Sequence, residues 1–452
     1  MKLWQKDNTS IDHAIEAFTV GQDRTLDLEL APYDVLGSLA HGQMLARIGL
    51  LTEDEFQALR PELIRIYAQI QQGEFVIEDS IEDVHSQVEG VLTQRLGDVG
   101  KKIHSGRSRN DQVLLDLRLF LRHELQEITM LTQTLFERLQ ALSEQHKDVL
   151  LPGYTHTQVA MPSSFGLWLG AYAESLVDDT QLLLAAYKIA NQNPLGSAAG
   201  YGSSFPLDRT LTTQLLGFDT LSYNVVYAQM GRGKVEKTVS FALSSVGATL
   251  GKLAADICLY VSQNFGFVSF PDQLTTGSSI MPHKKNPDVF ELVRAHCNKL
   301  IALPNEISLV IGNLTSGYHR DLQILKESLF PALHQTKQCL RIMHYALGHL
   351  RVNENILDDE RYRYLSSVEA VNREVMNGLP FRDAYRKVGQ QIADGTFSPV
   401  TALRHTHEGS LGNLCTGQIA EKMQQVLASV DFAKAERAIQ ELMTQAHQKS
   451  NH

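Results

Sequence analysis

Apolar residues recur every three or four positions along several long segments of the chain, and this spacing predicts α-helices. The clearest run extends from Asp111 to about His146, contains neither proline nor glycine, and would form a helix about 50 Å long. The same pattern recurs in four further segments: 162–190, 234–264, 287–310 and 319–350. Strand-like alternation is nearly absent, so five long helices in succession predict an up-and-down bundle. Pro331 either kinks the fifth helix or lies at its boundary.

The composition changes at both ends of this helical block, which predicts three domains. Gly97-Asp98-Val99-Gly100 precedes the block, and the polar stretch 351–362 follows it. Short helical patterns return at 381–392 and 431–448. We therefore expect an all-α protein with three parts: an N-terminal helical domain (1–107), a central long-helix bundle (108–356) and a small C-terminal helical domain (357–452).

Composition and charge exclude several classes of protein. The formal net charge of -10, without any long run of lysine and arginine, argues against a nucleic-acid partner. Residues 1–18 are studded with charges, unlike a signal peptide, and no uninterrupted apolar run approaches the ~20 residues of a membrane span. Four widely spaced cysteines are typical of reduced core thiols in the cytoplasm. We expect a soluble cytoplasmic protein without a membrane partner.

One loop, residues 277–287, gathers hydroxyls, cations and an amide around two prolines, and the carboxylate of Glu291 follows it. Pro287 suits the first position of a helix that Asn286 would cap. Gly277 leaves the preceding backbone free to move, so that the loop can close over a ligand. These side chains favour proton chemistry on an anion, although surface turns collect the same residue types.

The residue order of this loop, Gly-Ser-Ser-Ile-Met-Pro-His-Lys-Lys-Asn-Pro, resembles the signature of the fumarase/aspartase lyase superfamily, whose members release fumarate. Three further segments resemble the argininosuccinate lyase family within it: Ser105 to Val113, Gly153 to Gln158, and Tyr318 to Gln323 with Lys326. The resemblance runs from about residue 18 to the last hundred residues. It implies a three-domain fumarase/aspartase-like fold whose central helices form the 20-helix core of a homotetramer, with each active site shared by three subunits. It also implies cleavage of argininosuccinate to arginine and fumarate, the last step of arginine biosynthesis, without metal or other cofactor.

The implied elimination removes a proton beside a carboxylate and expels a guanidinium nitrogen. The resulting dianionic aci-carboxylate needs fixed cations and hydrogen-bond donors, and Lys284 with Asn286 supplies them. By resemblance Ser278 is the base, and its alkoxide would require loop N–H groups and the field of Lys284. His156, oriented by Glu291, would protonate the leaving nitrogen. Without the resemblance, His156 would be interpreted as a helix-end or core histidine.

The resemblance assigns the other candidates to substrate binding: Ser108, Arg109, Asn110, Thr155, Asn286, Tyr318, Gln323, Lys326, His85 and Arg232. Thr155 would contact a substrate carboxylate. Structural alternatives exist, because Ser108 or Asn110 can cap the long helix and Lys326 can be a solvated charge. Beside His85, Ser80 and Asp83 can form a capping box.

The His-Thr-His-Glu sequence at 405–408 contains metal-ligating residue types. A His-x-His pair on a loop without a third ligand is usually a solvated turn. We therefore expect no metal there.

The chain departs from the family pattern in three places. The usual Trp-Gly-Gly-Arg-Phe is replaced by Trp-Gln-Lys-Asp-Asn at 4–8, and the serine that commonly contacts substrate has no match in 18–24. Of the usual Ser-Asp-Arg-Asp before the third long helix, only Arg232 remains. Two alternatives stay open: a sibling lyase acting on adenylosuccinate, aspartate or malate, and a non-catalytic, crystallin-like structural protein.

Overall fold

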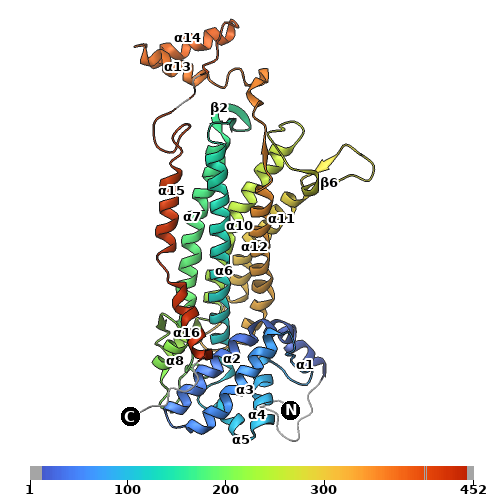
Figure 1. Ribbon diagram of the computed structural model, residues 1–452, viewed down its shortest axis with the longest axis vertical. Coiled ribbons are helices and arrows are strands. Elements are labelled where there is room, and N and C mark those ends of the chain that lie inside the picture. The colour runs from blue at the N-terminus through green and yellow to red at the C-terminus, as the bar shows by residue number, and fades with distance from the viewer. Residues whose placement is uncertain (1–12, 402, 404, 445–452) are drawn as a thin grey trace.

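Five long helices dominate the computed structural model, which describes residues 13–401, 403 and 405–444. They are α6 (Arg109–Gln145), α7 (Phe165–Ala190), α10 (Lys234–Val261), α11 (Asp288–Val310) and α12 (Leu325–Leu347). They run along the long dimension of the molecule (Figure 1), and their buried leucines, valines and aromatic residues form one continuous core. The predicted all-α bundle is confirmed. The departure at residues 4–8 lies outside the described residues.

The longest helix, α6, begins at a capping box. The Ser108 hydroxyl accepts the Asn110 N–H at 3.3 Å, and the Ser108 N–H donates to Asp111 Oδ1 at 2.8 Å. Such reciprocal bonds satisfy backbone groups that a helix start leaves unpaired. Asp111 Oδ2 also accepts the N–H groups of Gly196 and Ala198. The cap therefore joins the start of α6 to the connection between α7 and α10.

Close helix contact in the bundle depends on small residues. α6 packs against α7, and α10 packs against α7, α11 and α12. A Cβ on Gly247 would lie 3.0 Å from Leu300 Cβ, and one on Gly251 would lie 3.2 Å from Cys297 Cβ. These two glycines thus let α10 approach α11. Among the described helices, α10 alone also has the length and apolar composition of a membrane span, although here it is part of the packed bundle.

A layer of N-terminal helices crosses one end of the bundle (Figure 1). It consists of α1 (His13–Val20), α2 (Asp23–Arg47), α3 (Glu53–Gln71), α4 (Val84–Leu96), α5 (Asp98–Lys101) and the 3-10 turn η1 (Lys102–His104). A second hydrophobic cluster joins α2, α3 and α4 to α6. The short elements α8 (Arg209–Leu215), α9 (Val225–Met230) and the parallel pair β3 (Gln192–Asn193) and β4 (Thr220–Leu221) connect α7 to α10.

Small antiparallel sheets lie among the connections between the long helices. They are β1 (Leu150–Thr155) with β2 (Gln158–Ser164), β5 (Val268–Ser269) with β8 (Arg351–Val352), and β6 (Thr276–Gly277) with β7 (Lys285–Asn286). β2 and β6 lie toward the end of the bundle away from the N-terminal layer (Figure 1). The remaining 3-10 turns are η2 (Asp272–Leu274), η3 (Arg320–Ile324), η4 (Ile356–Asp358) and η5 (Glu360–Tyr362).

The last part of the chain first leaves the bundle and then returns along it. α13 (Ser367–Met376) and α14 (Phe381–Ala393) pack on each other around a small core of their own. α15 (Thr416–Leu427) packs on α6 and α7, and α16 (Phe432–Thr444) reaches α2 and α8 (Figure 1). The division at 107 and 356 stays a prediction.

Two predicted details are wrong, and a third is narrowed to one of its alternatives. Pro162 lies in β2, and α7 begins only at Phe165 because Ser164 caps it. Asn286 does not cap α11, because it pairs with Thr276 in the β6–β7 ladder and Pro287 takes the capping position. Of the two alternatives for Pro331, the boundary is excluded, because Pro331 lies inside α12; the kink stays a prediction.

The cysteines follow the predicted core role only in part. All four are free thiols. Cys297 and Cys339 are buried in the main core, whereas Cys258 and Cys415 are half-buried.

We expect Gly166→Ala to destabilise the fold. A Cβ at this second position of α7 would lie 2.5 Å from the Ser143 carbonyl oxygen and 2.6 Å from Lys147 Cα, both backbone atoms. Overpacking of this kind costs about 1–3 kcal/mol. Gly417→Ala is the matched control, because Gly417 holds the same position in α15 and a Cβ there meets nothing within 4 Å. Urea unfolding should show a lower midpoint for Gly166→Ala alone; equal midpoints would contradict the prediction.

Candidate functional site

A cavity of about 250 Å³ opens where the N-terminal layer meets the starts of α6 and α12. Seven of the predicted substrate-binding residues line it: His85, Arg109, Asn110, Arg232, Tyr318, Gln323 and Lys326. They come from four segments far apart in the sequence: α4, the start of α6, the connection between α9 and α10, and the segment that leads from α11 into α12. The structure thus gathers half of the predicted site residues in one place.

Lys326 is a buried cation, not the solvated charge of the alternative interpretation. Its side chain is 3% exposed, and its Nζ lies 2.7 Å from Asp23 Oδ1 and 2.6 Å from Asp27 Oδ1. Burial alone would lower the pKa of Lys326, but the two aspartates raise it above its ordinary value. The ammonium group is therefore charged and fixed at the cavity wall.

Two arginines share one carboxylate at the same cavity. Arg109 Nη1 lies 3.3 Å from Glu82 Oε2, and Arg320 Nη2 lies 2.8 Å from Glu82 Oε1. Arg109 also approaches Asp83 Oδ2 at 3.2 Å and donates to the Ser86 hydroxyl at 3.0 Å. These contacts hold both guanidinium groups in place near the start of α6. Such an arrangement suits the binding of carboxylates.

His85 is held as a cation by buried carboxylates. Its Nδ1 lies 2.7 Å from Asp34 Oδ1 and 3.5 Å from Asp116 Oδ2. Burial alone would lower the pKa of His85, but Asp34, Asp116 and Asp83 raise it to about 9. The predicted capping box at Ser80 is wrong, because α4 begins at Val84 and the Asp83 carboxylate caps it by accepting the Ser86 N–H.

Two groups of described residues have side chains of the types that bind metals. In each group, the carboxylates already pair with a cationic side chain. Asp34 and Asp116 surround the charged His85 ring. In the second group, His123 with Glu124 and Glu127, both glutamates pair with Lys337 at 2.8 and 2.9 Å. In the predicted solvated turn at 405–408, His405 Nε2 lies 3.0 Å from Glu369 Oε1.

Other candidates contribute to the cavity wall through structural contacts. Arg232 Nε lies 2.9 Å from Glu236 Oε1, and its Nη2 donates to the Leu322 carbonyl at 2.9 Å. Gln323 Nε2 donates to the carbonyls at the end of α1, with Thr19 at 2.9 Å and Val20 at 3.2 Å.

Three further candidates lie at the start of α6 or line the cavity. Asn110 presents its side chain at the cavity, and Tyr318 is partly exposed there. Ser108 is the cap of α6, as its structural alternative predicted.

The Ser278 loop lies elsewhere, between α10 and α11. Ser278 Oγ accepts the backbone N–H groups of Ile280 at 3.3 Å and Met281 at 3.2 Å. Lys284 is exposed, and its ammonium group makes no ion pair with any described residue. Its neighbour Lys285 instead pairs with Asp272. The serine oxygen and an uncommitted cation therefore lie on the same loop.

Four more candidates lie at the base of this loop, on α11 and at the β1–β2 hairpin. Asn286 pairs in β7 at the base of the loop, and Glu291 is exposed on the first turn of α11. Thr155 and His156 are exposed at the β1–β2 hairpin. Within the described residues no hydrogen bond or ion pair joins Glu291 to His156.

His156 is neither a helix-end nor a core histidine. It occupies the two-residue turn of the β1–β2 hairpin with Thr157, at φ values of 52° and 61°. Positive φ at both positions is the geometry of a type I′ turn, which asparagine and glycine adopt with less strain. The exposed imidazole of His156 is therefore carried by a strained backbone turn. Strained residues of this kind cluster at functional sites.

The long helices keep the two groups of candidates apart. Asn110 lies at the start of α6 and the His156 hairpin follows its end, and a helix of 37 residues spans roughly 55 Å. Arg232 precedes α10 and the Ser278 loop follows it, across 28 residues or roughly 42 Å. One chain therefore carries two groups of candidate residues toward opposite ends of the bundle (Figure 1).

Sequence reasoning missed five charged residues that line the cavity: Asp23, Asp27, Glu82, Asp83 and Arg320. A signal existed for two of them, because Asp23 and Asp27 are four residues apart and share one helix face. Arg320 belonged to a quoted motif but received no role. Nothing in the sequence pointed to Asp34 and Asp116, since only the packing of α2 on α6 brings them to His85.

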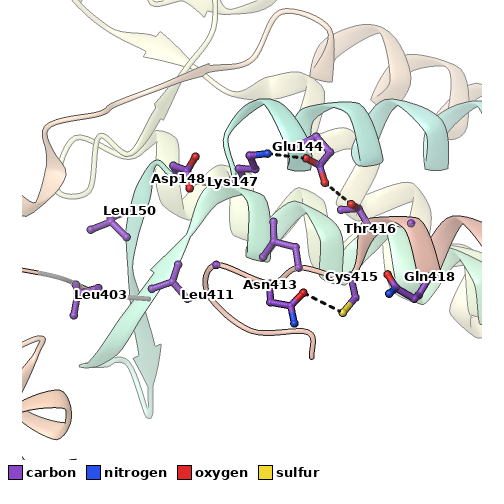
Figure 2. A pocket seen from close by; sticks show the side chains of 13 residues that line it. Glu144, Lys147, Asp148, Leu150, Leu403, Leu411, Asn413, Cys415, Thr416 and Gln418 are labelled. Carbon is purple, nitrogen blue, oxygen red and sulfur yellow. Dashed lines mark hydrogen bonds and ion pairs between the residues drawn. The ribbon is translucent and has the colours of Figure 1, made fainter. Parts of the chain in front are cut away.

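A second cavity, of about 580 Å³, lies between the end of α6 and the loop before α15 (Figure 2). Its polar side chains pair with one another: Glu144 contacts both Lys147 and Thr416, and the Cys415 thiol lies 3.7 Å from Asn413 Oδ1. It contains none of the predicted residues. We interpret these contacts as the attachment of α15 to the bundle.

Comparison with known proteins identifies the family. A family model described as "Lyase" matches residues 8–302. An argininosuccinate lyase from Parabacteroides distasonis is 62% identical over 442 residues, which cover 98% of this chain and 99% of that protein. An argininosuccinate lyase from Thermotoga neapolitana is 40% identical over 390 residues, covering 86% of this chain and 98% of that protein.

Solved structures show the same fold at low sequence identity. EDDS lyase in complex with formate has a TM-score of 0.75 at 22% identity, covering 96% of this chain and 94% of that one. A class II fumarase from Schistosoma mansoni has a TM-score of 0.71 at 14% identity, covering 95% and 94%. The fold is therefore fumarase/aspartase-like, and by sequence the chain belongs to the argininosuccinate lyase family.

Proposed function

We propose that this protein cleaves argininosuccinate to arginine and fumarate by β-elimination, the last step of arginine biosynthesis. The observation that carries the proposal is 62% identity to an argininosuccinate lyase along 98% of the chain. The sibling lyases and the crystallin-like role are not favoured by the comparisons.

The Ser278 loop supports a role for this serine as the base. A serine hydroxyl is a poor base unless its alkoxide is stabilised. The N–H groups of Ile280 and Met281 already point at Oγ, and hydrogen bonds to an ionised acceptor are roughly twice as strong as neutral ones. The proton passes from the substrate carbon to Ser278, and the electron pair moves into the adjacent carboxylate. Lys284 and Asn286 then stabilise the resulting dianion.

The His156 hairpin completes the proton transfer. In the second step the C–N bond breaks, and His156 donates a proton to the departing guanidinium nitrogen. Glu291 orients the imidazole, and Thr155 contacts a substrate carboxylate. Both side chains of the hairpin are exposed within one chain, as expected if they meet substrate only where subunits join.

The cavity at the start of α6 supplies the binding groups. Asn110, Tyr318, Gln323 and Lys326 hold the arginine half of the substrate, while Arg109 and His85 provide cations for its carboxylates. Ser108 and Arg232 act by positioning, because Ser108 caps α6 and the Arg232 guanidinium holds the Leu322 carbonyl.

We further propose a homotetramer in which three subunits build each site. Apolar side chains remain exposed along the outer faces of the long helices: Met130, Leu182, Phe241, Leu292, Leu309 and Tyr345. Exposed apolar surface of this kind marks association sites. The wide separation of the two partial sites supplies a functional reason for the same assembly. A cytoplasmic location fits the four free thiols.

Purified protein should release fumarate from argininosuccinate without added metal, because side chains supply the base, the acid and the cations. The ultraviolet absorbance of fumarate measures the reaction, with adenylosuccinate, aspartate and malate offered separately as controls. A chelator should leave the rate unchanged. Activity toward adenylosuccinate but not argininosuccinate would overturn the substrate assignment.

Ser278→Ala should lower kcat by roughly 10²- to 10⁴-fold, the range of general acid–base contributions, while leaving the melting temperature nearly unchanged. Ser279→Ala is the matched control, because Ser279 is the adjacent residue and its hydroxyl accepts neither of the two loop N–H groups. If Ser279→Ala were the more damaging change, Ser278 would be the wrong base.

Mixed tetramers of Ser278→Ala and His156→Asn should recover part of the activity that each variant lacks alone. If these residues reach each site from different subunits, some sites in a mixed tetramer receive both intact residues. Fumarate release after refolding the two variants together should reach a minority of the wild-type level. Inactive mixed tetramers, or an active wild-type monomer, would contradict the shared site.

A further inference from the structure

We propose that Asp23 is a specificity-determining residue whose carboxylate receives the α-ammonium group of the arginine half of the substrate. This inference rests on the proposed function and names the chemistry of one part of its site. Asp23 is the first residue of α2, is 15% exposed and lines the cavity. Asp23 is the residue of segment 18–24 that lines the cavity. The same segment of the sequence has no match to the serine of the family pattern.

The charge balance around Lys326 leaves one carboxylate without a full partner. Asp23 and Asp27 both contact the same ammonium group, at 2.7 and 2.6 Å. The two carboxylates therefore share one ammonium group, and Arg232, the other cation that acts on Asp23, is itself paired with Glu236. Burial raises the pKa of Asp23 to about 6, and the neighbouring Asp27 adds to the rise despite the opposing effect of Lys326. A second cation would stabilise Asp23 in its ionised form.

Asp23 is also the carboxylate with an unused oxygen. Asp27 uses both of its oxygens, because Oδ1 contacts Lys326 and Oδ2 accepts the Val84 N–H at 3.3 Å. Asp23 uses Oδ1 for Lys326, and its Oδ2 accepts no hydrogen bond from any described residue. A ligand donor therefore finds its acceptor at Asp23 rather than at Asp27.

The geometry favours an α-amino acid end over a guanidinium group. A guanidinium binds a carboxylate best through two parallel hydrogen bonds to both oxygens, and Asp23 has only one oxygen to offer. An α-amino acid carries an ammonium and a carboxylate on one carbon. Asp23 and Lys326, in direct contact, present the complementary pair of charges. The arginine half of argininosuccinate has such an end.

The test compares L-arginine with 5-guanidinopentanoate, which lacks only the α-ammonium group. Calorimetry should show that the wild-type protein binds arginine about 10- to 100-fold more tightly, the range expected for a hydrogen bond between charged groups. In Asp23→Asn this preference should fall below about threefold, because arginine loses affinity and 5-guanidinopentanoate does not. KM for argininosuccinate should rise while kcat stays within about twofold, since the contact is far from the bond that breaks.

Two further variants sharpen the result. Asp23→Ser removes the charge with a smaller side chain and should reproduce the loss of preference. Glu82→Gln is the control, because it removes a carboxylate of the same cavity that pairs with arginines, and it should keep the wild-type preference for arginine.

Three outcomes would overturn the proposal: no preference in the wild-type protein, an unchanged preference in Asp23→Asn, or an equal loss for both ligands, which would mean that Asp23 only supports Lys326. Absence of fumarate release by the wild-type protein would refute the proposed function instead, and the ligand comparison would still decide the role of Asp23.

Discussion

The length of the central helices is the constraint on which the rest of the structure depends. The Ser108 cap starts a helix of 37 residues, and the His156 hairpin follows its far end. A straight helix of that length holds its two ends roughly 55 Å apart, and no loop movement closes such a gap. The candidate binding residues and the candidate proton-transfer residues of one chain therefore cannot meet. If the proposed roles hold, a complete site requires association, and the exposed apolar side chains on the same helices are the surface proposed for it.

A second principle governs the cavity at the start of α6, where every cation is tied to a carboxylate. Lys326 rests on two aspartates, Arg109 and Arg320 share Glu82, and His85 is kept charged by its aspartate neighbours. Buried ion pairs are weak evidence for stability, because desolvation offsets much of their attraction. Their value here is preorganisation, since each charged group is held in place before substrate arrives. An anionic substrate with one ammonium end meets fixed partners of both signs.

Helical periodicity predicted the bundle because each long helix buries a continuous apolar stripe, a signal that local sequence carries in full. The short strands carried no such signal: β6 and β7 have two residues each, too few for alternation to show. The resemblance found seven of the cavity residues, but charges without a motif, such as Asp23 and Asp34, were missed. Their role arises only when α2 packs beside α4, α6 and α12, and that contact is not encoded in any local pattern.

The two halves of the proposed proton transfer are organised differently. The β6–β7 ladder pairs Thr276 with Asn286 and Gly277 with Lys285, which fixes both ends of the loop while its tip stays exposed. Ser278 follows the ladder directly, so the N–H groups two and three residues further along reach its oxygen without help from another element. The proposed activation of Ser278 is therefore local to one loop. The acid on its strained hairpin has no described partner within the chain, so its orientation must come from outside. Under the proposed roles, a subunit that folds alone would therefore present Ser278 with its two N–H donors in place, and the orienting contact of His156 would form only on assembly.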